Sequence, residues 1–154
     1  MEMERTRRHF LWLCAGLVGL GATARAQPKP ALVVFKDPTC GCCALWVTHM
    51  RDHGFTATVN DVADMAAVKT KLRVASTVRS CHTASVDGYV IEGHVPAADV
   101  RRLLRDRPKV VGIGVAGMPI GSPGMEVAGA KPHPFDVVAF DASGKTRTFA
   151  SHNK

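Results

Sequence analysis

Residues 31–43 read Ala-Leu-Val-Val-Phe-Lys-Asp-Pro-Thr-Cys-Gly-Cys-Cys, and this segment is the most informative part of the chain. The apolar run at 31–35 predicts a short buried strand, and Asp37-Pro38-Thr39 has the composition of a turn. From Cys42 the sequence contains helix formers and no glycine until Gly54. Three thiols are therefore expected where a strand turns into a helix. The free N–H groups and partial positive charge of a helix N-terminus favour thiolate over thiol there.

The segments that follow predict an α/β domain. The expected elements are a strand at 31–36, a helix at 42–53, a strand at 55–62, a helix at 64–72, strands at 83–86 and 89–91, and a helix that begins at Pro96 and stops before Pro108. Asp87-Gly88 is a strong signal for a two-residue hairpin turn between the third and fourth strands. The order β-α-β-α-β-β-α is the thioredoxin-like arrangement, in which a cysteine motif follows the first strand.

The C-terminal part of the chain has a different composition. Residues 108–135 are rich in glycine and proline, which predicts a long loop with room for one strand at 109–115. A loop of this length in a small domain is usually functional or disordered. Two β-rich runs flank Ser143-Gly144, at 135–140 and 146–150, and they predict a C-terminal β-hairpin.

The first 26 residues predict an export signal. Arginines precede an apolar stretch at 10–20 that is too short to span a bilayer, and Ala24-Arg25-Ala26 fits the small-x-small cleavage pattern. The adjacent arginines fit either a twin-arginine signal or an ordinary secretory signal. We expect cleavage after Ala26, loss of Cys14 with the signal, and one domain at 27–154 in the periplasm, with no membrane segment after cleavage.

The charge pattern argues against a nucleic-acid partner. The formal net charge is +7, and part of it lies in the predicted signal. The remaining positive charges are scattered, with no basic run and little aromatic interleaving, whereas a nucleic-acid-binding domain clusters its lysines and arginines on one face.

Four cysteines remain after the signal, and they form the first candidate site: Cys40, Cys42, Cys43 and Cys81. In an oxidising compartment this even count permits two disulfides, and Cys40 with Cys43 has a spacing that allows pairing. In thioredoxin-like folds the loop that holds Cys81 faces the first cysteines, so the four sulfurs are expected to converge. Convergent thiolates suit Cu(I), zinc or an iron–sulfur cluster. Zinc would prefer two separated C-x-x-C pairs, and Cu(I) accepts bridging thiolates, so the cluster can hold more than one copper ion.

Histidines and methionines supply further candidate ligands. His82 adjoins Cys81, His94 lies just before the third helix, and Met118 and Met125 lie in the Gly/Pro-rich loop. Imidazole and thioether both bind copper, and thioether selects Cu(I), although methionine also commonly packs on apolar surface. We expect His94 and Met118 to cap the copper, with His82 and Met125 as alternatives. Neighbouring side chains of an extended segment tend to point apart, which disfavours His82.

Four motifs together resemble the signatures of the CopG-like copper-resistance proteins, an exported, thioredoxin-like family long catalogued as a domain of unknown function. The motifs are Asp37–Cys43, Ser80–Thr83, Gly88–Pro96 and Gly117–Glu126. The resemblance covers nearly all of the chain after the predicted signal. It implies copper binding at Cys40, Cys42, Cys43 and Cys81, a role in periplasmic copper handling alongside other copper-handling proteins, and redox conversion between Cu(I) and Cu(II).

Three hypotheses for function follow. The first is a periplasmic copper-binding protein in copper resistance, with copper oxidoreductase activity left open. The second is a thioredoxin-like thiol–disulfide oxidoreductase that uses Cys40 and Cys43, and the third is a structural domain with two disulfides. A thioredoxin-type enzyme carries a proline just before the strand that faces its cysteines. Here that stretch is Cys81-His82-Thr83, without a proline, which favours the copper-binding hypothesis.

Overall fold

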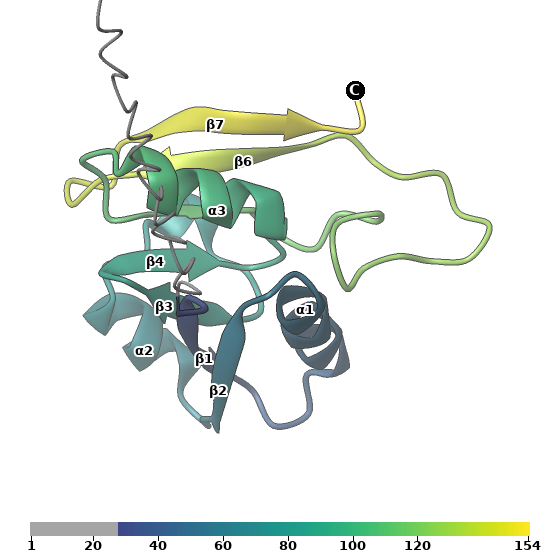
Figure 1. Ribbon diagram of the computed structural model, residues 1–154, viewed down its shortest axis with the longest axis horizontal. Coiled ribbons are helices and arrows are strands. Elements are labelled where there is room, and N and C mark those ends of the chain that lie inside the picture. The colour runs from purple at the N-terminus through teal and green to yellow at the C-terminus, as the bar shows by residue number, and fades with distance from the viewer. Residues whose placement is uncertain (1–27) are drawn as a thin grey trace, which may run out of the picture.

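A seven-stranded mixed sheet organises the computed structural model, which describes residues 28–154 (Figure 1). The strands are β1 (Ala31–Lys36), β2 (Thr56–Asp61), β3 (Thr83–Val86), β4 (Tyr89–Glu92), β5 (Gly112–Gly114), β6 (Phe135–Phe140) and β7 (Thr146–His152), in the spatial order β2-β1-β3-β4-β5-β6-β7. The helices are α1 (Gly41–Asp52), α2 (Met65–Lys71) and α3 (Ala97–Asp106), with a short 3₁₀ helix η1 (Ser76–Val78). The predicted α/β class and element order are confirmed. The 3₁₀ helix was not expected, and the export signal predicted at 1–26 lies outside the described residues.

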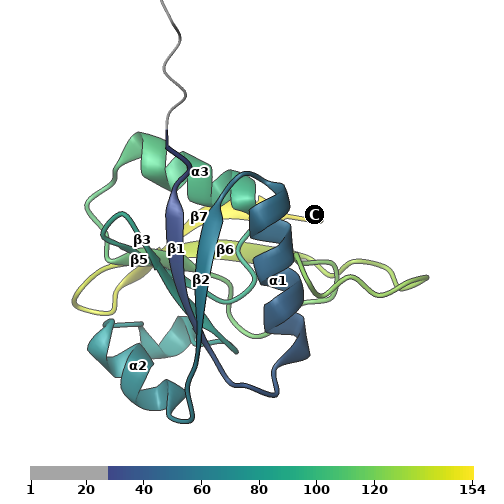
Figure 2. The same cartoon turned by 60° about the horizontal axis from the view of Figure 1, so that its bottom comes forward.

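The first β-α-β unit places the cysteine motif at a helix N-terminus. β1 and β2 pair in parallel from Ala31 opposite Thr56 to Lys36 opposite Asp61, and α1 makes the crossover between them (Figure 2). Cys40 is the N-cap residue of α1. The helix ends before Gly54, whose φ of +81° is a left-handed conformation that favours glycine. The predicted strand-to-helix turn is therefore present, with the thiols at its helical end.

The hairpin of β3 and β4 brings two distant sequence positions together. Its turn residues Asp87 and Gly88 have φ values of +47° and +85°, as a type I′ turn requires. Thr83 at the start of β3 lies opposite Glu92 at the end of β4. Because the open ends of a hairpin meet, the residues just before β3 lie beside those just after β4. The N–H of Gly93 accordingly donates to the carbonyl of His82 at 2.9 Å.

Helices and loops cover both faces of the sheet. On one face Ile91 of β4 lies in a cluster with Trp46 of α1 and Leu103 of α3, and all three are fully buried. The next residue in β4, Val90, points to the other face and packs in a second cluster with Val78 of η1. No helix among residues 28–154 is both long enough and apolar enough to cross a membrane.

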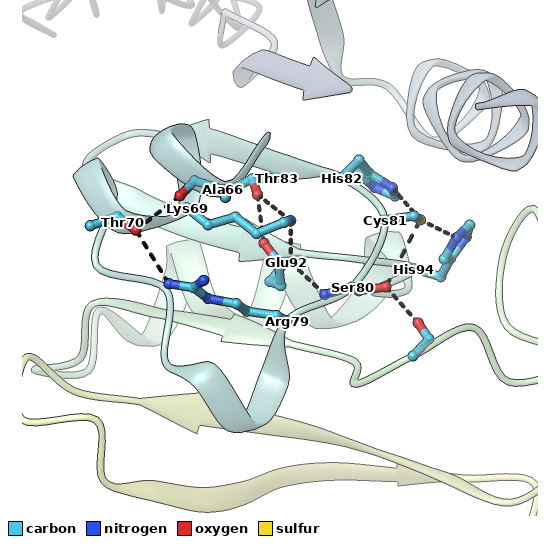
Figure 3. Close-up of polar contacts among 11 residues, drawn as sticks. Ala66, Lys69, Thr70, Arg79, Ser80, Cys81, His82, Thr83, Glu92 and His94 are labelled. Carbon is cyan, nitrogen blue, oxygen red and sulfur yellow. Dashed lines mark hydrogen bonds and ion pairs between the residues drawn. The ribbon is translucent and has the colours of Figure 1, made fainter. Parts of the chain in front are cut away.

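A buried ion pair supports the β3–β4 hairpin from the side of α2 (Figure 3). The Lys69 Nζ atom lies 2.6 Å from Oε1 of Glu92, and these residues are 6% and 0% exposed. The same carboxylate accepts hydrogen bonds from the Thr83 hydroxyl and from the Ser80 N–H, each at 2.6 Å. Burial raises the pKa of Glu92, while the Lys69 charge and these hydrogen bonds oppose that rise. The carboxylate therefore joins α2, β3, β4 and the segment that leads into Cys81.

We predict that Lys69→Met lowers the free energy of unfolding by about 3 kcal/mol, because it leaves the Glu92 carboxylate buried without its partner. The double variant Lys69→Met/Glu92→Gln should be more stable than Lys69→Met alone. It carries no buried charge, and the glutamine oxygen can still accept from Ser80. Urea denaturation of the wild type and both variants measures these values. A double variant that loses as much as or more than Lys69→Met would contradict the prediction.

Candidate metal centre

The four cysteines lie together at the N-terminal end of α1. Their sulfur atoms all lie within 4.8 Å of one another, although Cys81 is 38 or more residues away in sequence from the others. Cys40 and Cys43 are joined by a disulfide, while Cys42 and Cys81 are free thiols. The Cys42 Sγ atom lies 3.5 Å from that of Cys40. The structure thus contains one disulfide among these cysteines, and the second disulfide of the structural hypothesis is not formed.

Two imidazole rings contact the Cys81 thiol. The Sγ atom of Cys81 lies 3.0 Å from Nε2 of His94 and 3.3 Å from Nδ1 of His82 (Figure 3). The three ligand atoms lie within 4.8 Å of one another and form a second group suited to a metal ion. Cys81 belongs to both this group and the cysteine cluster. A thiolate in that position can bridge two soft metal ions.

The expectation that His82 points away from Cys81 is wrong. It rested on extended geometry, but β3 begins only at Thr83, so the strict alternation of a strand does not apply. The His82 ring instead packs on Trp46, with ring centroids 4.4 Å apart. Its Nε2 atom is buried and has no hydrogen-bond partner among the described residues. One ring nitrogen, Nδ1, therefore contacts Cys81, and the other is buried without a hydrogen bond, which makes His82 a candidate ligand.

The His94 ring is oriented by the long loop. Its Nδ1 atom lies 2.8 Å from the carbonyl oxygen of Pro123, which can only accept, so Nδ1 carries the proton. Nε2 is left with its lone pair directed at the Cys81 sulfur. A second partner that fixes the tautomer is a usual feature of metal-binding histidines. Burial lowers the pKa of both His94 and His82, so both rings are neutral at neutral pH, and neutral imidazole is the form that binds metal.

The Cys81 thiol is protonated in the metal-free protein at neutral pH. Burial raises its pKa to about 11, and the nearby Cys42 contributes to the rise. A soft metal ion binds the thiolate, so it must displace this proton. Before a metal binds, Cys81, His82 and His94 are therefore uncharged, with Cys81 half-buried and both histidines buried.

Of the two candidate methionines, Met118 is the one that the structure places beside a thiol. Its Sδ atom lies 3.9 Å from the Cys42 sulfur, and the residue is 51% exposed. Met125 is half-buried, and its N–H closes a turn onto the carbonyl of Ser122. Met118 is therefore at the open side of the cluster, where it could cap a bound ion.

The long loop between β5 and β6 approaches α1 closely at one glycine. Gly124 has a φ of +83°, and a Cβ atom there would lie 2.8 Å from the backbone nitrogen of Trp46 and 3.0 Å from the carbonyl oxygen of Cys42. A larger residue would push this loop away from α1, and with it the Pro123 carbonyl that orients His94. Sequence reasoning missed Pro123 because a backbone carbonyl has no sequence signature. The one sequence feature that pointed to this loop as part of the site was its glycine- and proline-rich composition together with its two candidate methionine ligands.

Residues 78–125 match a family model described as a protein of unknown function, DUF411. No curated protein matches the chain. Two solved structures are similar to it, entitled "Copper resistance protein copG- Form 1" and "Form 2". Each is 44% identical in sequence with a TM-score of 0.76, and the alignments cover 82% and 80% of this chain and 98% of those chains. The family model includes Cys81, His82, His94 and both methionines but begins after the first three cysteines.

We predict that protein isolated in air without residues 1–26 has two titratable thiols per chain when denatured, and four after reduction. The disulfide between Cys40 and Cys43 accounts for the difference. Alkylation followed by peptide mass spectrometry should label Cys42 and Cys81 before reduction. A denatured, unreduced protein with no reactive thiol would show instead that Cys42 and Cys81 also form a disulfide.

Proposed function

Because the chain belongs to the CopG-like family of copper resistance proteins, we propose that it binds copper as Cu(I) on its cysteine cluster and its two buried histidines. The observation that carries the proposal is the double role of Cys81, whose sulfur lies within 4.8 Å of every ligand atom in both candidate groups. A copper-handling role follows from the family and the cysteine cluster. We propose in addition that the copper is Cu(I), that more than one ion binds, and that the cysteines and the two histidines are its ligands.

The donor set favours Cu(I) over harder metals. Thiolate, thioether and neutral imidazole are soft or borderline ligands, and no carboxylate is among the two candidate metal-binding groups of the described residues. Calcium and magnesium require oxygen ligands, so the site does not suit them. Cu(I) tolerates two or three ligands and bridging thiolates. The shared position of Cys81 therefore supports more than one copper ion, with Met118 as a cap on the exposed side.

The disulfide suggests how the same site could change the oxidation state of copper. If Cys40 and Cys43 are reduced, their oxidation to the disulfide releases two electrons and two protons. Two Cu(II) ions would accept these electrons and become two Cu(I) ions, for which Cys42, Cys81 and the two histidines would remain as ligands once Cys40 and Cys43 have formed the disulfide. In this scheme the structure corresponds to the oxidised protein. A thiol reductant in the same compartment would restore the dithiol.

A thiol–disulfide oxidoreductase is the second candidate, favoured by the disulfide between Cys40 and Cys43 at the start of α1. The position before β3, where a thioredoxin-type enzyme has its proline, holds buried His82. The residues just before β3 are thus Cys81 and His82, which the copper proposal uses as ligands, with no proline to bind a substrate peptide. Insulin reduction separates the two functions, because only an oxidoreductase would accelerate it.

We further propose that the protein acts in the periplasm, where the export signal predicted at residues 1–26 would deliver it. Other copper-handling proteins of that compartment would donate or accept the metal. Cys40, Cys42 and Cys81 are only half-buried, and Met118 beside Cys42 is 51% exposed, so a partner could reach the cluster. Transfer of Cu(I) between two thiolate sites needs such access.

We predict that Cys81→Ser lowers the affinity for Cu(I) by more than tenfold, which corresponds to about 1.4 kcal/mol of binding free energy. The change removes the sulfur shared by both ligand groups and leaves a hydroxyl that is a poor ligand for Cu(I). Anaerobic titration of the reduced protein against a competing Cu(I) chelator measures the affinity. Thermal unfolding of both metal-free proteins serves as the control for loss of structure. Equal affinity and stoichiometry in the two proteins would remove Cys81 from the site.

A further inference from the structure

We propose that Ser80 is a positioning residue, whose hydroxyl tethers the Met118 segment to the Cys81 segment and so holds the Met118 thioether at the copper site. This inference rests on the proposed function, because it assigns Ser80 a role in Cu(I) binding through another residue. The tether itself is a property of the metal-free protein. It can therefore be tested separately.

The backbone N–H of Ser80 is held by the buried carboxylate of Glu92. Its N–H donates to Glu92 Oε1 at 2.6 Å, and Glu92 is 0% exposed (Figure 3). Glu92 is held in turn by Lys69 and Thr83. A hydrogen bond to a buried charged group is stronger than one between neutral groups. Ser80 is thus anchored to the buried ion pair of the hairpin, although it lies in an irregular segment.

The side chain of Ser80 is also confined. Gly93 faces it so closely that a Cβ atom at Gly93 would lie 2.6 Å from both Cβ and Oγ of Ser80. Only the absence of a side chain at Gly93 leaves room for the serine. The hydroxyl is therefore directed by its surroundings, and it donates to the carbonyl oxygen of Gly117.

The segment that receives this hydrogen bond has little else to hold it. Residues 116–118 are all exposed, and none of them forms a backbone–backbone hydrogen bond among the described residues. A Cβ atom added at Gly117 would meet nothing within 4 Å. The hydrogen bonds that hold this segment among the described residues are that of the Ser80 hydroxyl to the Gly117 carbonyl and that between the Cys42 and Met118 sulfurs. Without the first, the second would have to order the segment alone.

A second role for Ser80 would give a similar loss of affinity. Its Oγ atom also lies 3.9 Å from the Cys81 sulfur, so the hydroxyl could act on that thiol directly. The two roles differ in their dependence on Met118. If Ser80 acts as a tether, it can raise the Cu(I) affinity only when residue 118 has a sulfur that binds copper. If it acts directly on Cys81, it raises the affinity with any residue at position 118. A double-mutant cycle separates them.

The copper arm of the experiment compares the wild type, Ser80→Ala, Met118→Leu and Ser80→Ala/Met118→Leu by anaerobic Cu(I) titration against a chelator. We expect Ser80→Ala to weaken binding by about threefold to tenfold, the range of one net hydrogen bond. The double variant should bind as well as Met118→Leu alone. The matched control is Met125→Leu, in which Ser80→Ala should keep its full effect. No effect of Ser80→Ala, or the same effect in the Met118→Leu background, would overturn the inference.

The metal-free arm tests the tether without copper. In Met118→Cys the new thiol lies one bond nearer the backbone than the Met118 sulfur, which is 3.9 Å from the Cys42 sulfur, so a short thiol-bridging reagent should cross-link residue 118 to Cys42, detected by mass spectrometry. Adding Ser80→Ala should slow this reaction several-fold. An unchanged rate would overturn the tether. If the wild type binds no Cu(I), the proposed function fails and the positioning role with it, while slower cross-linking in Ser80→Ala would still support the tether itself.

Discussion

The register that aligns the ends of three strands is the constraint on which this site depends. Phe35 near the end of β1 lies opposite Thr83 at the start of β3, and Thr83 lies opposite Glu92 at the end of β4. The segments that leave the sheet at this edge carry the cysteine motif, the Cys81-His82 pair and His94. Main-chain hydrogen bonds therefore bring the ligand candidates together before any metal binds. A shift of one residue in this register would turn the side chains of a whole strand to the opposite face.

The buried Glu92 carboxylate extends that register into a segment without regular structure. Residues 79–82 cannot satisfy their backbone donors in a strand, and a buried N–H without a partner would be costly. Glu92 supplies the acceptor for Ser80, and Lys69 balances its charge. Buried ion pairs contribute little net stability, because desolvation offsets their attraction. The role of the Lys69–Glu92 pair here is to position other groups. Glu92 holds the backbone N–H of Ser80, the residue next to Cys81, and the Ser80 hydroxyl in turn binds the segment that contains Met118.

The fold was predictable where local chemistry decides it. β1, the Asp87-Gly88 turn and the glycine after α1 each follow from a few adjacent residues, and the convergence of Cys81 on the first cysteines follows from the order of these elements. The parts that could not be predicted depend on the path of the long loop. Glycine and proline give that loop no periodicity, so nothing in the sequence places Pro123 on His94 or Gly117 on Ser80. The contact of His82 with Cys81 was missed because strand alternation was applied one residue too early.

The central claim is that copper binds where the cysteine cluster and the two histidines share Cys81. The most direct test is anomalous diffraction at the copper absorption edge from crystals of protein loaded with Cu(I) under anaerobic conditions. The account predicts anomalous peaks within bonding distance of the Cys81 sulfur and of Nε2 of His94. Peaks only elsewhere would contradict it, for example at His49 of α1 and the C-cap residue His53, whose ring centroids are 4.2 Å apart.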